Sequence, residues 1–410
     1  MFRSKTTHRA LVALSMLLLT VVSGCARPPE AEKEPEEPKF QGELSLWIAG
    51  GLTGFPGRLE DGWASERARA FEALHPGITV SLRQFDTGEE LEAALLTSSA
   101  QLPDLVFGRP MPGFGDRLAT LDPLLTPEVT GDLLPGALAA FQSGGKSFGL
   151  PVLVEAPVLA LNGAAFGQAG LALPAEGRWS EEEFAQALGK LSGTGLLALG
   201  FSVTPEYHEW WPLADGLLTA DQKAAPGAQS GLRRLAEWRQ SGLLAPDLAM
   251  LSQAEAYQRF AAGRMAILPV SLPMLPLLRA DKVDLSVAAF PGGKTAGYVY
   301  GFTFGKQADT TKLKSALALA EFIGAPDQQV RQARATGLLP VRKSAGNPFD
   351  GDPLLTRAWQ VTTAVQPLPS GPVWDQAQEP IARELLLTLT GNKEPAAALT
   401  AIEQMATTPR

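Results

Sequence analysis

Leu44-Ser45-Leu46-Trp47-Ile48 predicts a buried strand, and a glycine-rich loop follows it at residues 49–54. Residues 65–75 carry apolar side chains at helical spacing, and Pro76-Gly77 ends that helix. Residues 78–82, 88–98 and 105–107 then predict a strand, a second helix and a third strand. This β-α-β-α-β order implies a mostly parallel sheet covered by helices.

A second α/β region is expected from about residue 155 onward. Ser180 and Glu183 have the capping-box spacing that begins a helix. Apolar runs of strand length occupy residues 196–199, 265–268 and 285–288, and residues 312–324 carry an apolar stripe at helical spacing. The chain has 410 residues, which is long enough for two domains.

The composition excludes several classes of protein. A hydrophobic content of 45% supports a large core and excludes wholesale disorder. The 43 acidic side chains outnumber the 35 basic ones, which argues against nucleic-acid binding. One cysteine excludes an intramolecular disulfide framework and an all-thiolate zinc site, and the three histidines leave little for metal chemistry. We therefore expect neither a metal nor a cofactor.

Motifs of catalysis are mostly absent from the sequence. Gly144-Gly145-Lys146-Ser147 lacks the first glycine that a phosphate-binding loop requires, because Ala140 stands there. The GxGxxG, HExxH and GxSxG patterns do not occur. We therefore expect no enzyme. A glycoside hydrolase stays open as an alternative, since it needs only two carboxylates.

The N-terminal residues predict a secretory leader. Arg3, Lys5 and Arg9 precede the apolar run of residues 10–22, which is shorter than the ~20 residues that span a bilayer as a helix. A basic start, a short apolar run and then small residues are typical of a signal peptide. Residues 1–24 are expected to be removed.

The end of this leader, Val22-Ser23-Gly24-Cys25, is similar to the lipobox of bacterial lipoproteins. Cleavage there would leave Cys25 as a lipidated N-terminus, and two or more acyl chains hold a protein stably on a membrane. Residues 25–42 are rich in Pro and Glu and predict an extended tether. We expect an extracytoplasmic, membrane-anchored lipoprotein, in the periplasm or on the outer face of the cell membrane. An ordinary signal peptide followed by an incidental cysteine is the alternative.

Six short passages, spread over residues 42–344, carry a resemblance to a known family. They are GELSLWI (42–48), FEALHPGITV (71–80), PDLVF (103–107), GKSFGLPVLVEA (145–156), FAAGRMA (260–266) and LLPVRKS (338–344). In this order they resemble bacterial extracellular solute-binding proteins of family 1, which serve ATP-binding-cassette (ABC) importers. Within that family the passages are similar to the maltose/maltodextrin-binding proteins.

The resemblance implies a two-lobed periplasmic-binding-protein fold of type II, in which each lobe is a mostly parallel sheet flanked by helices. Lobe I would hold residues 43–153 and 304–339, and lobe II would hold residues 157–298 and 342–410. Hinge crossovers would fall near residues 154–156, 299–303 and 340–341. A monomer of this kind closes over a small solute, with a carbohydrate or polyol favoured, and delivers it to the permease of an ABC importer.

The same resemblance points to ligand-binding residues. Glu155 matches the crossover glutamate that contacts ligand in the family. Glu206, Tyr207 and His208 match a passage in which a glutamate and an aromatic side chain touch sugar. Trp210, two residues further on, is open to a ligand or a packing role.

Three further aromatic residues are candidates because of their places in the sequence. Trp47 ends the first strand, where a core role and a cleft role are equally compatible with the pattern. Tyr300 borders the second crossover, and Trp374 follows a segment rich in Pro and Gly. Aromatic faces stack on the C–H surface of sugar rings, while carboxylates accept hydrogen bonds from hydroxyl groups.

The sequence also departs from the maltodextrin-binding pattern. Gly51 and Leu52 stand where an acidic–basic pair is expected, and Gly108, Met111 and Pro112 replace other contact residues. The pattern expected in the C-terminal helix is replaced around Gln378 and Ala382. Maltose as the ligand therefore does not follow. A binding lipoprotein without a transport role, acting as a sensor or interaction module, is the other alternative.

Overall fold

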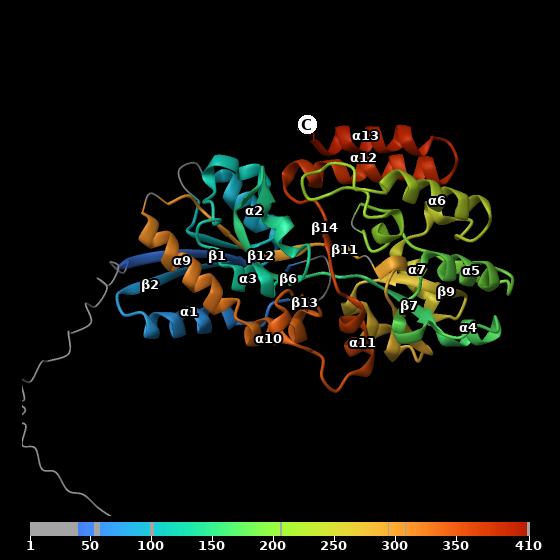
Figure 1. Cartoon of the computed structure of the whole chain (residues 1–410), viewed down its shortest axis with the longest axis horizontal. Coiled ribbons are helices and arrows are strands. Elements are labelled where there is room, and N and C mark those ends of the chain that lie inside the picture. Colours follow the sequence, from blue (N-terminus) through green and yellow to red (C-terminus); the bar gives the residue numbers. More distant parts are fainter. Residues whose placement is uncertain are drawn as a thin grey trace, which may run out of the picture. The chain divides into compact units, whose positions relative to one another are not determined.

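The computed structural model describes residues 40–52, 58–98, 102–205, 207–293, 295–307 and 309–407. The predicted leader, Cys25 and Glu206 lie outside these ranges. Phe40–Arg410 form one compact unit, in which two α/β regions are built around separate sheets (Figure 1). Within the described residues, we find no helix whose length and apolar character would let it cross a membrane.

The first region contains a six-stranded sheet with a mixed strand direction. Its order is β13-β6-β12-β3-β1-β2, and β1 pairs in parallel with both β2 and β3, as predicted. The expectation of a mostly parallel sheet does not hold for the remaining pairs, because β12 runs antiparallel to β3 and β6, and β13 runs antiparallel to β6. No helical crossover dictates the direction of β12, since the chain reaches it from the second region. The strands are β1 Gly42–Ala49, β2 Ile78–Phe85, β3 Leu105–Gly108, β6 Gly149–Val154, β12 Val299–Phe304 and β13 Leu339–Pro340.

Helices cover both faces of this sheet, because side chains alternate along each strand. Leu46 of β1 packs in the same core as Phe71 of α1, whereas Ala49 packs with Leu91 and Leu95 of α2. Figure 1 shows α1 and α2 on opposite sides of the sheet. The helices of this region are α1 Trp63–Leu74, α2 Gly88–Thr97, α3 Pro127–Asp132, α9 Thr310–Ile323 and α10 Pro326–Thr336.

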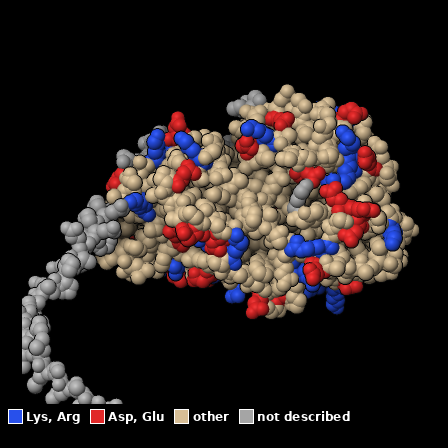
Figure 2. Space-filling view, viewed as in Figure 1, with Lys and Arg blue, Asp and Glu red and all other residues tan. Residues whose placement is uncertain are grey.

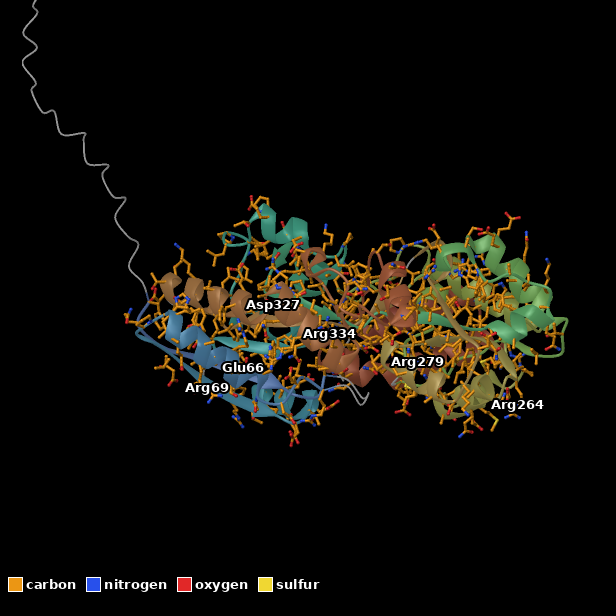
Figure 3. The ribbon with its side chains drawn as sticks, turned by 90° about the horizontal axis from the view of Figure 1, so that it is seen from below. Glu66, Arg69, Arg264, Arg279, Asp327 and Arg334 are labelled. Carbon is orange, nitrogen blue, oxygen red and sulfur yellow. The ribbon has the colours of Figure 1, made fainter. Side chains whose placement is uncertain are left out.

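Surface ion pairs join α10 to the start of α1. Arg331 of α10 lies 2.5 Å from Glu60 and 3.1 Å from Glu66, and Glu66 is labelled on α1 in Figure 3. These side chains are partly exposed to water, so each pair contributes at most about 1 kcal/mol.

The second region is built on a four-stranded sheet of order β10-β7-β9-β8. Only β8 and β9 are parallel here, so this sheet is also mixed, again because its middle strand β7 arrives directly from the other sheet. The predicted capping box of Ser180 and Glu183 is present at the start of α5. The strands are β7 Val158–Asn162, β8 Leu197–Leu199, β9 Met265–Val270 and β10 Leu285–Ala288, and the helices are α4 Gly163–Gln168, α5 Glu181–Ser192, α6 Ala228–Gln240, α7 Gln253–Ala261, α8 Leu275–Ala280 and α11 Pro353–Val361.

Two C-terminal helices complete the second region. They are α12 Pro372–Leu389 and α13 Pro395–Thr407, which pack against each other and against α6 (Figure 1). The described residues also include short strands and 3-10 turns: β4 Gln142–Ser143, β5 Lys146–Ser147, β11 Ala296–Gly297, β14 Gln366–Pro367, η1 Pro112–Arg117, η2 Ala137–Phe141, η3 Ala175–Gly177, η4 Trp211–Ala214, η5 Leu248–Met250, η6 Leu272–Met274, η7 Pro291–Gly293 and η8 Lys343–Ala345.

The chain passes between the two sheets more than once. It leaves the six-stranded sheet after β6 and enters the other at β7, so the predicted crossover at residues 154–156 falls at this passage. It returns between β10 and β12 through β11, which pairs with β14. Residues 299–303 themselves belong to β12, so this second passage precedes the predicted hinge. The lobe boundaries stay predictions.

Candidate ligand-binding cleft

A cleft with a volume of about 1100 Å³ is lined by side chains of both α/β regions. Its wall on the first region includes Arg109 and Tyr300, and its wall on the second includes His208 and Glu209. Ligand pockets for small molecules commonly hold ~300–1,000 Å³, so the cleft has room for a solute of that size or larger.

The ends of strands bring the cleft residues together. Arg109 directly follows β3, and Glu155 directly follows β6 at the passage to the second sheet. Tyr298 directly precedes β12, and the backbone N–H of Glu155 donates to its carbonyl oxygen at 2.8 Å. Strand ends are where open α/β sheets bind their ligands, which agrees with the place of the cleft.

Arg109 and Asp375 form an ion pair in the cleft, which we call the paired group. The Arg109 guanidinium donates to both carboxylate oxygens, with N–O distances of 3.4 Å and 3.3 Å. The amide of Gln378 also donates to Asp375, at 2.9 Å, and the Arg109 guanidinium lies 5.2 Å from the centroid of the Tyr298 ring. Burial raises the pKa of the Asp375 carboxyl, and the charge of Arg109 opposes that effect. The pair links the end of β3 to α12.

Glu155, His208 and Glu209 form a second set, which we call the unpaired group. Their exposed fractions are 8%, 8% and 6%. Among the described residues, Nδ1 of His208 and Oε1 of Glu209 have no hydrogen-bond partner. Buried polar atoms without partners are costly, and they gather at functional sites.

The surroundings shift the proton affinities of the unpaired group. Burial raises the pKa of Glu209 to about 8, and the negative charge of Glu155 adds to this effect. Burial also raises the pKa of Glu155 to about 7, against the opposing charge of Arg109. For His208, burial lowers the pKa to about 3, with a further contribution from Arg109. Water exclusion is therefore the main cause in all three cases.

Three aromatic rings surround His208. Its ring centroid lies 5.0 Å from that of Trp211, 5.7 Å from that of Tyr298 and 5.8 Å from that of Trp374. The indole N–H of Trp374 donates to the hydroxyl of Tyr298 at 3.2 Å. The two tryptophans therefore support the cleft wall from behind.

Four of the eight predicted ligand-binding residues line the cleft: Glu155, Tyr207, His208 and Tyr300. Glu206 lies outside the described residues. The structure does not bring Trp47, Trp210 or Trp374 to the lining.

The three tryptophans pack elsewhere because their large apolar rings find partners in the core. The ring of Trp47 lies 5.5 Å from that of Phe85, with the guanidinium of Arg83 over it at 4.6 Å. Trp210 is 1% exposed and stacks on Phe201, with ring centroids 5.2 Å apart. Trp374 is fully buried in its contacts with His208 and Tyr298.

Several lining residues were not among the sequence candidates, and most of them neighbour a signal in the sequence. Arg109 directly follows an apolar strand, Glu209 follows His208, and Asp375 follows Trp374. Gly51, Leu52 and Gln378, which depart from the maltodextrin-binding pattern, also line the cleft. The resemblance therefore located positions that line the cleft even where the residue types differ from the maltodextrin-binding pattern.

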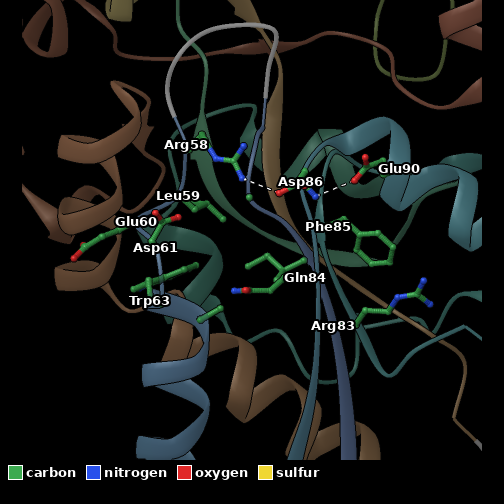
Figure 4. A pocket seen from close by; sticks show the side chains of 14 residues that line it. Arg58, Leu59, Glu60, Asp61, Trp63, Arg83, Gln84, Phe85, Asp86 and Glu90 are labelled. Atoms are coloured by element: carbon green, nitrogen blue, oxygen red, sulfur yellow. Dashed lines mark hydrogen bonds and ion pairs between the residues drawn. The ribbon is translucent and has the colours of Figure 1, made fainter.

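A smaller hollow of about 320 Å³ adjoins the cleft near the start of α1 (Figure 4). Arg58 and Asp86 form a 3.3 Å ion pair at its edge, and the backbone N–H of Asp86 donates to Glu90 at 3.0 Å. The Arg58 and Asp86 side chains are 52% and 81% exposed, so water satisfies them. No cluster of three or more His, Cys, Asp or Glu able to hold a metal ion occurs within the part of the chain that the structure describes. The cleft, which holds buried polar atoms without partners, is the stronger candidate site.

Two α/β regions with a cleft between them define a two-lobed binding protein. The chain belongs to the bacterial extracellular solute-binding protein family, whose model matches residues 66–363. The sequence resemblance to solute-binding proteins and the predicted fold class are thereby confirmed.

Individual relatives are distant. An uncharacterised lipoprotein in the oleD 5′ region of Streptomyces antibioticus is 26% identical over 385 residues, covering 87% of this chain and 81% of that protein. The sugar-binding protein MalE from Xanthomonas citri has a similar structure, with a TM-score of 0.69 and 18% identity over 88% of this chain and 95% of that chain. The cyclic alpha-maltosyl-1,6-maltose binding protein from Arthrobacter globiformis gives a TM-score of 0.66 and 19% identity, with 90% and 98% covered. At these identities the structural likeness concerns the fold alone.

Proposed function

We propose that this protein is the substrate-binding lipoprotein of an ABC importer and that it captures a carbohydrate or polyol in the cleft. The observation that carries the proposal is the combination of aromatic side chains with buried, unpartnered polar atoms in one cleft. Sugar rings need both, because their C–H faces stack on aromatic rings and their hydroxyl groups need hydrogen-bond partners. The names of the related structures, which include a sugar-binding protein, support this choice of ligand class.

Delivery to a permease follows from closure of the predicted lobes. A ligand that contacts both walls binds the closed form better and shifts the population toward it, so a permease can distinguish loaded from empty protein. Lipidation at Cys25 would hold the folded unit at the membrane where the permease lies. We expect a Cys25→Ala variant to leave the membrane fraction, and a variant that stays there would refute the anchor.

A thermal-shift screen of the purified protein tests the proposed ligand class. The screen contains neutral sugars, oligosaccharides, amino sugars and polyols, with peptides and organic anions as the comparison set. A ligand at about 100 times its Kd should add about 2.7 kcal/mol to the free energy of unfolding. A response to peptides or anions alone would refute the carbohydrate proposal.

Glu155 provides the first residue-level test. A Glu155→Gln variant should bind the saccharide found in the screen about tenfold more weakly, because the amide loses the charge-assisted acceptor. Exposed Glu237 on α6 provides the matched Glu→Gln control. Unchanged affinity of the Glu155→Gln variant would remove this residue from the site.

Glycoside hydrolysis is the second candidate function, because Glu155 and Glu209 put two carboxylates in one cleft. We propose binding without turnover, in line with the family of extracellular solute-binding proteins. Chromatography of the saccharide after long incubation with the protein should return it intact. Shortened products that disappear in the Glu155→Gln variant would favour the hydrolase.

A further inference from the structure

The charges that line the cleft are not balanced. Its two arginines are each paired with a carboxylate, Arg109 with Asp375 and Arg58 with Asp86. Five more carboxylates also line it, and within the described residues no cation forms an ion pair with them: Glu89, Glu92, Glu155, Glu209 and Glu379. On the face drawn in Figure 2, by contrast, acidic and basic side chains are interspersed. Acidic side chains therefore outnumber basic ones in the lining of the cleft.

Two of these carboxylates are buried and line the same cleft. Glu155 and Glu209 are 8% and 6% exposed, and the charge of Glu155 acts on Glu209. Oε1 of Glu209 has no hydrogen-bond partner among the described residues. A hydroxyl group of a neutral sugar could donate to such an oxygen, but it would not compensate a negative charge on either carboxylate in a site shielded from water. An ammonium group donates three hydrogen bonds and also cancels charge.

The neighbouring side chains suit a cation as well. The Tyr298 ring packs against the guanidinium of Arg109 at 5.2 Å, and the rings of Tyr207 and Tyr300 line the same cleft. Aromatic faces attract cations, and more strongly where water is excluded. Nδ1 of neutral His208 offers one more acceptor if it carries no proton.

We infer that the solute is a carbohydrate bearing a basic amino group, and that its ammonium lies between the carboxylates of Glu155 and Glu209. The inference rests on the proposed carbohydrate function and adds the charge of the ligand to it. The same ammonium chemistry could come from an alkyl diamine, so the experiment includes one.

Calorimetry with matched sugar pairs tests the inference. The first set is the β-1,4-linked trimers of glucose, glucosamine and N-acetylglucosamine, which differ only at position 2. The second set pairs glucosamine, galactosamine and mannosamine with glucose, galactose and mannose, and 1,4-diaminobutane is the diamine. At least one amino sugar should bind about tenfold or more tightly than its neutral partner. Because the ammonium favours ionised carboxylates, its binding near neutral pH should also release protons into the buffer, and that of the neutral partner should not.

The variants assign the effect to the two carboxylates. Glu155→Gln and Glu209→Gln should each reduce the preference for the amino sugar about tenfold, whereas Glu237→Gln, at an exposed position of α6, should leave it unchanged. The melting temperature without ligand shows that each variant is folded.

The outcomes separate the two proposals. If no amino sugar binds more tightly than its neutral partner, the inference is overturned, and a bound neutral sugar would keep the carbohydrate function intact. Equal or tighter binding of 1,4-diaminobutane would overturn the sugar part of the inference. A cleft that binds no saccharide at all would refute the carbohydrate function itself.

Discussion

The paired and unpaired groups lie in the same cleft, but they differ in whether their polar atoms have partners. Arg109 and Asp375 satisfy each other. Glu155, His208 and Glu209 are more deeply buried, and among the described residues His208 and Glu209 each hold an atom without a hydrogen-bond partner. Tyr298 contacts both groups, with its ring 5.2 Å from the Arg109 guanidinium and 5.7 Å from the His208 ring. We propose a division of roles, in which the paired group fixes the cleft walls and the unpaired group recognises the solute.

The largest effect is expected from removing the charge of Glu209. Its pKa is about 8 in the folded protein and 4.5 as the ordinary value, so the folded protein holds the proton more tightly. Its contribution to stability is therefore present below about pH 4.5 and is lost as the pH rises toward about 8. The difference in free energy of unfolding between Glu209→Gln and the wild type should therefore grow in favour of the variant as the pH rises. The increase should be on the order of 3 kcal/mol from about pH 5 to about pH 8.5, because one pKa unit corresponds to ~1.36 kcal/mol.

Urea unfolding of both proteins across this pH range measures the difference. The groups that act on Glu209 include Glu155, so the double variant with Glu155→Gln separates their shared repulsion. A Glu209→Gln difference that does not change with pH would mean that the carboxyl is hydrated, and the contrast between the two groups would then fail.

A smaller effect on stability is expected when the ion pair of Arg109 and Asp375 is broken. Arg109 and Asp375 are 24% and 31% exposed, so replacing Arg109 with Gln should cost about 2 kcal/mol, less than for a fully buried pair. In a double-mutant cycle with Asp375→Asn, a coupling energy of about 1–2 kcal/mol is expected. A coupling near zero would show that the pair does not hold the walls together.

Protonation of His208 in acid should lower the free energy of unfolding by about 1 kcal/mol. Burial lowers its pKa to about 3 from the ordinary value of 6.5, so the unfolded chain binds the proton more tightly. Its contribution to stability is lost as the pH falls from about 6.5 toward about 3. Between about pH 6.5 and about pH 5.5, the free energy of unfolding of the wild type should therefore fall by about 1 kcal/mol more than that of a His208→Gln variant. Parallel stability curves for the two proteins would show that His208 is accessible to water.

The sequence predicts the elements better than it predicts the cleft. The alternation of residues 44–48 and the capping box of Ser180 and Glu183 are local signals, and the structure contains the corresponding elements. The strand directions could not be predicted in the same way, because β12 reaches its neighbours from the second region. Arg109 and Asp375 are 266 residues apart, and no local pattern joins them.

The tryptophan candidates show a second limit of prediction from the sequence. A core position and a sugar-stacking position both favour a large aromatic ring, so the residue type alone cannot separate them. The polar candidates Glu155 and His208 were more informative, since burying such groups is costly unless a ligand or a partner satisfies them.

The smallest effect on binding is expected from Trp47, and it tests this explanation. Its ring packs on Phe85 beneath Arg83 and does not line the cleft. Trp47→Leu should therefore lower the free energy of unfolding by about 1–2 kcal/mol through lost packing. The affinity for the bound saccharide should stay within about twofold, which corresponds to ~0.4 kcal/mol. Tyr300→Leu provides the matched comparison, because Tyr300 lines the cleft and should affect binding. A tenfold loss of affinity in Trp47→Leu alone would place its ring against the ligand after the lobes close, and recognition would then extend beyond the unpaired group.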